Sequence, residues 1–332
     1  KQTQPSPKEI RLVVLPFENL GIVEDESSSD VITEAITSRL VGMSGLNIIS
    51  RRSAIKYKNK EIGTQQIAEE LGVDYILEGA VQQGQSSDPN SQPQRMIVQL
   101  VRASDDTEIW AKIYDVDVSG FFQIESDITG RVVQALNITL LEPERRGLES
   151  RPTENAAAYA YYICGNYYHN RSFDNSDWEI AIQMYEEAIG LDPTFALAYA
   201  RLSWVHSHMY WHTIDRSNER LVLAEQAARK ALELNPDLPE GHLALGFYYY
   251  WGHHDYIHAL GEFALVQKSR PNDGELLFSI GLIQRRQGKF NQALANIKKA
   301  SELDPLWHIA ALEVGYTLLF LRRYSECEHY YD

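Results

Sequence analysis

Residues 271–305 read PNDGELLFSIGLIQRRQGKFNQALANIKKASELDP, and this stretch decides the fold of the second half of the chain. It contains two helical patterns and has a proline at each end, Pro271 and Pro305. Gly281 in the first pattern and Ala293 in the second let two antiparallel helices approach until their backbones nearly touch. Pro305 ends the second helix because its ring clashes with the preceding turn and its nitrogen carries no hydrogen. The stretch therefore predicts one helix pair of a stacked array.

The spacing resembles that of tetratricopeptide (TPR) repeats, which have an apolar–glycine pair in the first helix, a small residue in the second and a closing proline. After Pro152, closing prolines recur at Pro193, Pro236, Pro271 and Pro305. This register predicts an all-α TPR solenoid of about four and a half repeats over 155–332, with extra residues around 171–176 and 213–220. The fifth repeat stops before its proline, so we expect the chain to be a fragment of a longer protein.

The first part of the chain alternates short apolar runs with amphipathic helical patterns. Strands are expected at 11–16, 46–50, 75–83, 96–101 and 109–116, and helices at 31–40, 64–71 and 123–140. Polar stretches join the last three strands, which favours an antiparallel meander. The sequence therefore predicts an α/β domain with a mixed sheet and helices over 10–142. A linker over 1–9 precedes it, and a second linker over 143–154 leads into the solenoid.

Six blocks of this domain, in order, resemble the TolB amino-terminal-like domain. They are RLVVLPFENL, DVITEAITSRL, LNIISRRSAIKYKNK, IAEELGVDYILEGAVQ, EIWAKIYDVDV and FFQIESDITGRVVQAL. The resemblance implies no catalytic residues. It implies a sensory or scaffolding region before a TPR array, in a bacterial regulator of the adenylate-cyclase, serine/threonine-kinase or winged-helix type. It also implies an extracytoplasmic or periplasmic location, anchored by a transmembrane helix outside this sequence.

In the TPR family the first helix of each pair lines the concave face, so the resemblance assigns groove positions residue by residue. The groove set is Tyr159, Tyr162, Asn166, Trp204, His208, Phe247, Tyr250, Trp251, Phe278, Arg285, Arg286 and Tyr316, with Leu243, Leu282, Leu312 and Phe320 beside them. Aromatic and arginine side chains anchor protein partners. We therefore expect the groove to bind a protein or peptide segment with apolar side chains, and Arg285 and Arg286 to bind a carboxylate of that partner. For any single aromatic the alternative is burial in the core.

Composition excludes several other classes of partner. The formal net charge is −15, which argues against a nucleic-acid backbone or an anionic membrane as the main partner. The sequence contains no run of about 18 apolar residues, so we expect no direct membrane insertion. The two cysteines, Cys164 and Cys327, lie far apart in helical apolar patterns and are expected as core residues rather than a disulfide.

Candidate chemical sites are weak. His208 and His212 are four residues apart, as are His254 and His258, a spacing that places both rings on one helix face. The second pair falls near a predicted turn, where polar residues face water, and we expect no metal site. No glycine-rich phosphate-binding motif occurs, so no cofactor is expected. The basic residues Arg51, Arg52, Lys56, Lys58 and Lys60 are expected on a solvated face, and the alternative is contact with an anion or with an acidic surface of a partner.

The sequence therefore predicts a non-catalytic interaction or scaffold module of a bacterial signalling protein, which binds a partner segment in the concave TPR groove. The alternative is a small-ligand sensor with its site in the α/β domain or at its junction with the first repeat. The partner, the oligomeric state and the output domain of the full-length protein stay open at this stage.

Overall fold

The computed structural model describes residues 10–20, 27–43, 45–60, 62–83, 94–116, 120–149, 151–172, 174–328 and 330. Backbone contacts divide the chain into two compact units. The first contains the described residues up to 149, together with 272–274 and 298–313. The second contains those of 151–271, 275–297 and 314–330. The predicted linker over 1–9 lies outside the described residues.

The first unit is an α/β domain that contains the predicted strands and helices and, in addition, β2, α2, η1 and α5. Its elements up to residue 71 are β1 (Ile10–Val14), β2 (Glu18–Asn19), α1 (Ser27–Val41), β3 (Leu46–Ile48), α2 (Arg51–Ala54), the short helix η1 (Ile55–Tyr57) and α3 (Thr64–Leu71). They are followed by β4 (Tyr75–Gln83), β5 (Gln94–Arg102), β6 (Thr107–Val116), α4 (Phe121–Ala135) and α5 (Glu142–Glu149).

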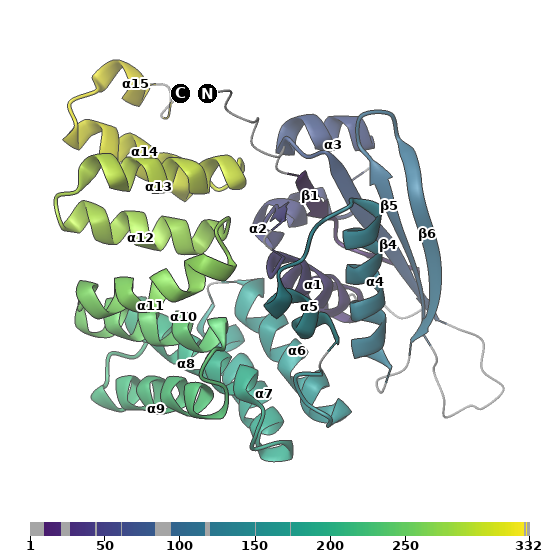
Figure 1. Cartoon of the computed structure of the whole chain (residues 1–332), viewed down its shortest axis with the longest axis horizontal. Helices are drawn as coiled ribbons and strands as arrows, with labels where there is room; N and C mark the ends of the chain where they lie inside the picture. The colour runs from purple at the N-terminus through teal and green to yellow at the C-terminus, as the bar shows by residue number, and fades with distance from the viewer. Residues whose placement is uncertain are drawn as a thin grey trace. The chain divides into compact units, whose positions relative to one another are not determined.

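The sheet is mixed, in the order β3-β1-β4-β5-β6, and β2 also pairs with β4. Strands β1, β4, β5 and β6 are labelled in Figure 1. β1 runs parallel to β3 and β4, whereas β4, β5 and β6 form an antiparallel meander. The parallel strands are joined through helices, because a parallel pair needs a crossover connection. The antiparallel strands follow one another directly along the chain.

Each face of the sheet is covered by its own helices. Leu12 and Leu77 belong to a core cluster that includes Ile36 of α1 and Ile128 of α4. The neighbouring residues Val13 and Ile76 point to the other face, where they pack with α2 and α3. This division follows from the two-residue period of a strand, which sends successive side chains to opposite faces.

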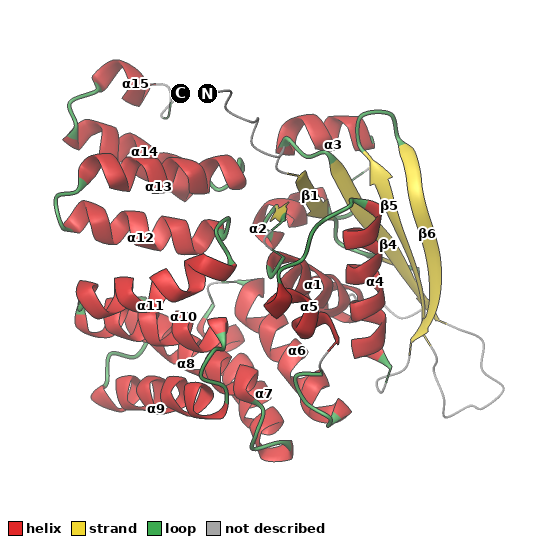
Figure 2. Cartoon of the chain, viewed as in Figure 1, coloured by secondary structure: helices red, strands yellow, loops and turns green. Residues whose placement is uncertain are grey.

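The chain after residue 155 is built from antiparallel helix pairs, drawn in red in Figure 2, and its residues outside 272–274 and 298–313 belong to the second unit. The pairs are α6 (Ala156–Arg171) with α7 (Asn175–Leu191), α8 (Ala196–Trp211) with α9 (Asn218–Leu234), and α10 (Pro239–Phe247), extended by the π-helical turn η2 (Tyr248–Gly252), with α11 (Tyr256–Ser269). They continue as α12 (Gly274–Arg286) with α13 (Phe290–Leu303) and α14 (His308–Phe320) with α15 (Tyr324–Glu328). An α/β region followed by a helical repeat region is the fold class that the sequence predicts.

The extra residues of the first two repeats lengthen their helices. α6 and α8 have 16 residues each, against 13 in α12 and in α14. α7 and α9 have 17, against 14 in α11 and in α13. An α-helix turn takes about 3.6 residues, so each of the early helices is about one turn longer.

Helix α5 differs from the expected linker over 143–154. It covers Glu142–Glu149, and backbone contacts group it with the first unit. Its sequence, EPERRGLE, is strongly polar, which is why no apolar face indicated a helix there. Asn155 then caps α6, because its side chain accepts hydrogen bonds from the backbone N–H groups of Ala157 and Ala158.

Candidate functional site

Five of the twelve predicted groove residues lie inside the second unit. Tyr159, Tyr162, Asn166, Phe247 and Tyr250 are each less than 9% exposed. The ring of Phe247 stacks between those of Trp204 and Trp251 and also meets Phe263 of α11. These five side chains form part of the interior and leave little surface for direct contact with a partner.

The remaining seven keep exposed surface. Trp204, His208, Trp251, Phe278 and Arg285 are half-buried, while Arg286 and Tyr316 are exposed. The structure brings Phe278, Arg285 and Tyr316 together on α12 and α14, and places Trp204, His208 and Trp251 on α8 and η2. The groove set therefore separates into two surfaces with different chemistry.

The first surface combines exposed apolar side chains with two arginines. It is here called the distal groove because the repeat register predicts that its residues line the concave face. It consists of Phe278, Leu282, Arg285, Arg286, Tyr316, Leu319 and Phe320. Tyr316, Leu319 and Phe320 are 49%, 42% and 61% exposed, although the opposite side of α14 buries Val314 and Leu318. Leu319 is not among the predicted groove residues, although its spacing from Tyr316 places the two on one helix face.

Hydrogen bonds fix the two arginines of the distal groove. Arg286 donates from Nη1 to the Tyr250 hydroxyl at 2.8 Å and lies over the rings of Tyr250 and Trp211. Arg285 donates from Nη1 to Thr317 Oγ1 at 3.3 Å, which ties α12 to α14. Within the described part of the chain, no carboxylate is recorded within ion-pair distance of Arg286. A guanidinium held in this way can donate hydrogen bonds to a carboxylate of another molecule.

Trp204, His208 and Trp251 belong to a second group, here called the histidine–tryptophan cluster, which also contains His169, Trp178 and His212. His169 and Trp178 are its buried members. His169 Nε2 lies 3.3 Å from His208 Nδ1. The His208 ring is stacked between Trp178, with centroids 4.5 Å apart, and Trp251, at 5.2 Å. The η2 turn carries Trp251 into this stack. His169 and His208 come from the last turns of α6 and α8, the longer first helices of the early repeats, whereas His212 directly follows α8 and Trp251 belongs to η2.

Burial makes His169 a very weak base. Its side chain is 5% exposed, its Nδ1 has no hydrogen-bond partner among the described residues, and its ring stands edge-on to Trp204. Desolvation, and secondarily the positive charge of Arg201, lower the pKa of His169 to about 3. Arg201 in turn lies over the Trp204 ring at 4.8 Å. At neutral pH the His169 imidazole is therefore uncharged.

The histidines do not form a metal centre in the described residues, where no group of three His, Cys, Asp or Glu side chains converges. His208 and His212 do meet, with ring centroids 4.6 Å apart. The other pair is separated by the turn: His254 has a positive φ of 54°, and His258 Nδ1 lies 2.6 Å from Asp255 Oδ2. Cys164 and Cys327 are free thiols.

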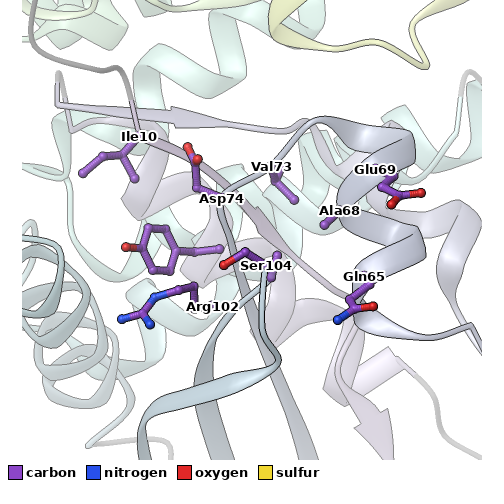
Figure 3. Close-up of a pocket in the computed structure, with 10 residues that line it drawn as sticks. Ile10, Gln65, Ala68, Glu69, Val73, Asp74, Arg102 and Ser104 are labelled. Atoms are coloured by element: carbon purple, nitrogen blue, oxygen red, sulfur yellow. The ribbon is translucent and has the colours of Figure 1, made fainter.

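The first unit contains a pocket of about 710 Å³ at the start of β4 (Figure 3). Its lining residues are Ile10, Gln65, Ala68, Glu69, Val73, Asp74, Tyr75, Arg102, Ala103 and Ser104. Arg102 donates from Nη1 to Asp105 Oδ2 at 3.2 Å, and Asp74 Oδ2 accepts from the Arg11 backbone N–H at 3.1 Å. The pocket thus offers both acidic and basic groups around a small apolar floor.

The basic segment over 51–60 differs from the predicted solvated face, because two of its side chains pair with carboxylates of α1. Lys58 Nζ binds both carboxylate oxygens of Asp30 at 3.0 Å, and Arg51 lies 3.5 Å from Glu34. Asp30 and Glu34 are 6% and 3% exposed on α1. Arg51 and Lys58 therefore compensate buried carboxylates.

With this geometry established, known proteins offer two sequence matches. Residues 274–305 match the family model of the tetratricopeptide repeat, which confirms the prediction made from Gly281, Ala293 and Pro305. The chain is 29% identical over 249 residues to "Putative adenylate cyclase 3" of Rhizobium meliloti (strain 1021). That alignment covers 74% of this chain but only 41% of the relative, so the chain spans less than half of the relative's length.

Solved structures offer partial likenesses. One, titled "Functional Characterization of Pseudomonas Aeruginosa pilF", has a TM-score of 0.43 and 24% identity, and covers 53% of this chain and 74% of that one. PilW, described as a type IV pilus biogenesis factor, has a TM-score of 0.42 and 20% identity over 53% and 75% of the two chains. MamA from Desulfovibrio magneticus RS-1 has a TM-score of 0.40 and 14% identity, and the match covers 54% of this chain and 93% of MamA.

The resemblance of residues 10–142 to the TolB amino-terminal-like domain stays a prediction. No helix among the described residues is both long and apolar enough to span a membrane. What the comparisons and the fold establish together is an α/β region followed by helical repeats, of which residues 274–305 match the tetratricopeptide repeat.

Proposed function

We propose that this chain is a non-catalytic protein-interaction module of a bacterial signalling or regulatory protein, and that its distal groove binds a segment of a protein partner. The observation that carries the proposal is the exposed row Tyr316, Leu319 and Phe320 beside the arginines of α12. Exposed apolar patches on soluble proteins mark interaction sites. A row of this kind on one helix face suits an amphipathic partner helix or an extended segment.

The chemistry of the distal groove supports a particular kind of segment. Bulky apolar side chains would pack on Tyr316 and Phe320, and a single Asp or Glu would reach Arg286. The net charge of −15 opposes long-range attraction of a strongly acidic partner. We therefore favour a segment with one carboxylate, held at short range, over a polyacidic one.

The signalling context rests on sequence relationships alone. The relative named an adenylate cyclase has more than twice the length that this chain spans, and the TolB-like resemblance points to the same class of host protein. We infer that this chain supplies interaction or regulation, and that any catalytic output belongs to a separate region of the host.

A direct binding measurement tests the proposal. Fluorescein-labelled peptides that pair a Leu, Phe or Trp with a Glu at several spacings are titrated with the protein, and fluorescence anisotropy gives the Kd. We expect Phe320→Ser and Arg286→Gln each to weaken the best peptide at least tenfold, because buried aromatic and arginine contacts dominate such interfaces. Ile257→Ser is the matched control, since Ile257 is 80% exposed on α11, outside the distal groove. Equal binding by all four proteins would exclude the distal groove as the site.

The pocket of the first unit favours a second candidate function, small-ligand sensing. A ligand that carries both a carboxylate and an amine would match Arg102 and the acidic side chains Asp74 and Glu69. A ligand present at 100 times its Kd raises the free energy of unfolding by about 2.7 kcal/mol. A thermal-shift screen of amino acids and small carboxylates should then raise the Tm of the wild type but not of Arg102→Gln. A screen without any such shift removes this candidate.

A further inference from the structure

Strand β6 forms an open edge of the sheet in the first unit. In the described part of the chain one side of β6 pairs with β5 and no strand pairs with the other side, in keeping with its outer position in Figure 1. β6 has ten residues, whereas β3 at the opposite edge has three. An edge strand presents a row of backbone N–H and C=O groups that can pair with another strand. The longer edge therefore offers a template for a strand from outside the sheet.

Two features that commonly protect an edge strand, a β-bulge and a lysine, are both found in β6. The bulge lies where the register with β5 shifts between Leu100 and Val101, so it affects only the start of β6, and every residue of 110–115 has a partner in β5. Lys112 donates from Nζ to Asp127 Oδ2 of α4 at 2.8 Å, which holds its ammonium group on the helix-covered face. Neither feature therefore covers the second half of the edge.

The second half of β6 carries an exposed apolar side chain at its centre. Ala111, Ile113 and Asp115 share one face, because side chains alternate along a strand, and all three are exposed. Ile113 is 58% exposed, although it lies directly opposite Ile97 of β5. Tyr114, on the other face, is only 7% exposed. Ile113 is thus the apolar centre of the open edge.

We propose that β6 pairs with β6 of a second copy of this chain, in antiparallel orientation about a two-fold axis at Ile113. In this pairing Ile113 meets Ile113 of the second copy, Lys112 meets Tyr114, and Ala111 meets Asp115. The two sheets become one continuous sheet. Because both copies use the same patch, the contact is closed and the assembly stops at two chains.

Complementarity within β6 selects both the occupant and the register. The pairing places two isoleucines together, a lysine beside an aromatic ring, and a carboxylate opposite a small neutral side chain. Lys112 already lies 4.8 Å from the centre of the Tyr114 ring in its own chain. An axis at Lys112 would set two ammonium groups opposite each other, and an axis at Ala111 would draw the bulge into the pairing. An axis at Tyr114 would set Asp115 opposite Ile113.

We expect the dimer to be weak. One pair of strand edges buries less surface than the roughly 1,200 Å² of a stable interface, and the net charge of −15 on each copy opposes association. The Kd should be on the order of 10–100 µM, and it should fall at higher salt, which screens the repulsion. The pairing does not depend on the distal groove. A dimer nevertheless presents two distal grooves, so a partner with two binding segments would gain avidity.

Sedimentation velocity over a wide range of protein concentrations tests the dimer. The wild type should shift reversibly from monomer to dimer. Ile113→Lys should weaken the dimer about tenfold, because it sets two like charges at the two-fold axis. Ile257→Lys is the matched control, since Ile257 is 80% exposed on α11 and this variant gains the same charge. A wild type that stays monomeric would leave the edge to a segment of another protein and overturn the proposal, as would equal dimerisation by all three proteins.

Disulfide cross-linking tests the register, in a Cys164→Ala background because Cys164 is only half-buried. Ile113→Cys should form disulfide-linked dimers under mild oxidation, since opposed Cα atoms of an antiparallel pair are about 4.5–5.5 Å apart, within reach of a disulfide. Ala111→Cys is the control. It is exposed on the same face, but its two copies would be displaced along the strands by four residues, about 13 Å. Cross-linking of Ala111→Cys as fast as Ile113→Cys, or of neither variant, would contradict a two-fold axis at Ile113.

Discussion

Gly246 of α10 lies directly against the ring of Phe263 of α11, so that a Cβ atom at position 246 would come within 2.4 Å of Phe263 Cε1. The same arrangement recurs between Gly165 and Tyr185, at 2.5 Å. In the repeat that gave the clearest sequence signal, the closest atom to such a Cβ at Gly281 belongs to Ile297 rather than to Ala293. The glycine of the first helix thus leaves the space in which a large side chain of the second helix packs.

Gly246→Ala should therefore destabilise the solenoid by about 1–3 kcal/mol, because the added methyl group overpacks the contact with Phe263. Urea unfolding followed by circular dichroism measures the change. The matched control is Gly261→Ala on α11, where an added Cβ meets nothing within 4 Å. Because alanine favours a helix over glycine, the control should gain roughly 0.5–1 kcal/mol. A Gly246→Ala protein as stable as this control would contradict the assigned packing.

Tyr185→Phe should cost about 1–3 kcal/mol, since it leaves a buried acceptor without its donor. The Tyr185 hydroxyl donates to Asn166 Oδ1 at 2.8 Å, and the two side chains are 0% and 3% exposed. Chemical denaturation gives the free energy of unfolding. Tyr324→Phe serves as the control, because Tyr324 is 59% exposed, and it should change stability by less than 0.5 kcal/mol. Similar losses in both variants would argue against the buried hydrogen bond.

A second histidine contributes to acid sensitivity independently of His169. Burial, followed by the charge of Arg220 and opposed by Asp215, lowers the pKa of His206 to about 4. The folded state therefore keeps His206 neutral, and the stability it contributes above pH 6.5 is lost as the pH falls toward 4. At pH 5 the loss is about 2 kcal/mol. His206→Gln should flatten the dependence of unfolding free energy on pH between 6.5 and 4, and an unchanged slope would refute this assignment.

The first unit offers a test of its buried charges. Lys58→Met removes the partner of both Asp30 carboxylate oxygens and should cost roughly 3 kcal/mol, because Asp30 is 6% exposed and loses its closest cation. Arg51 Nη2 stays 3.8 Å from Asp30 Oδ2, so we expect the loss to lie near the lower end of the range known for broken buried ion pairs. Arg95→Met is the control, since its pair with Asp115 is exposed and should be worth under 1 kcal/mol. Equal effects in denaturant titrations would rule out the buried role of Lys58.

The regular elements could be predicted from the sequence because their signals are local. The antiparallel meander β4–β6 follows from alternating apolar residues, and the repeat pairs follow from the spacing of glycine, alanine and proline. Helix α5 was missed because it has no apolar face, and η2 because nothing in YYYWG distinguishes a π-helical turn from an α-helical one.

The groove was harder to predict than the fold, because burial depends on contacts between repeats. Phe247 and Tyr250 occupy concave positions in the repeat register, yet they are 2% and 1% exposed. Stacking on Trp204, Trp251 and Trp211 covers them, and no pattern within one repeat predicts that. By contrast, the extra residues near 171–176 and 213–220 did indicate irregular repeats, and the histidine–tryptophan cluster lies beside them.

The longer helices of the early repeats limit how this solenoid can be rebuilt by gene duplication or by design. A unit such as α12 and α13 matches neighbours of its own length and can be copied or deleted in register. The pairs α6/α7 and α8/α9 share an additional layer of contacts at one end, so neither can be exchanged for a standard 34-residue module without leaving the other's last turn uncovered. We therefore expect the first two repeats to be duplicated or replaced together, and substitutions in one to be constrained by the residues that it contacts in the other.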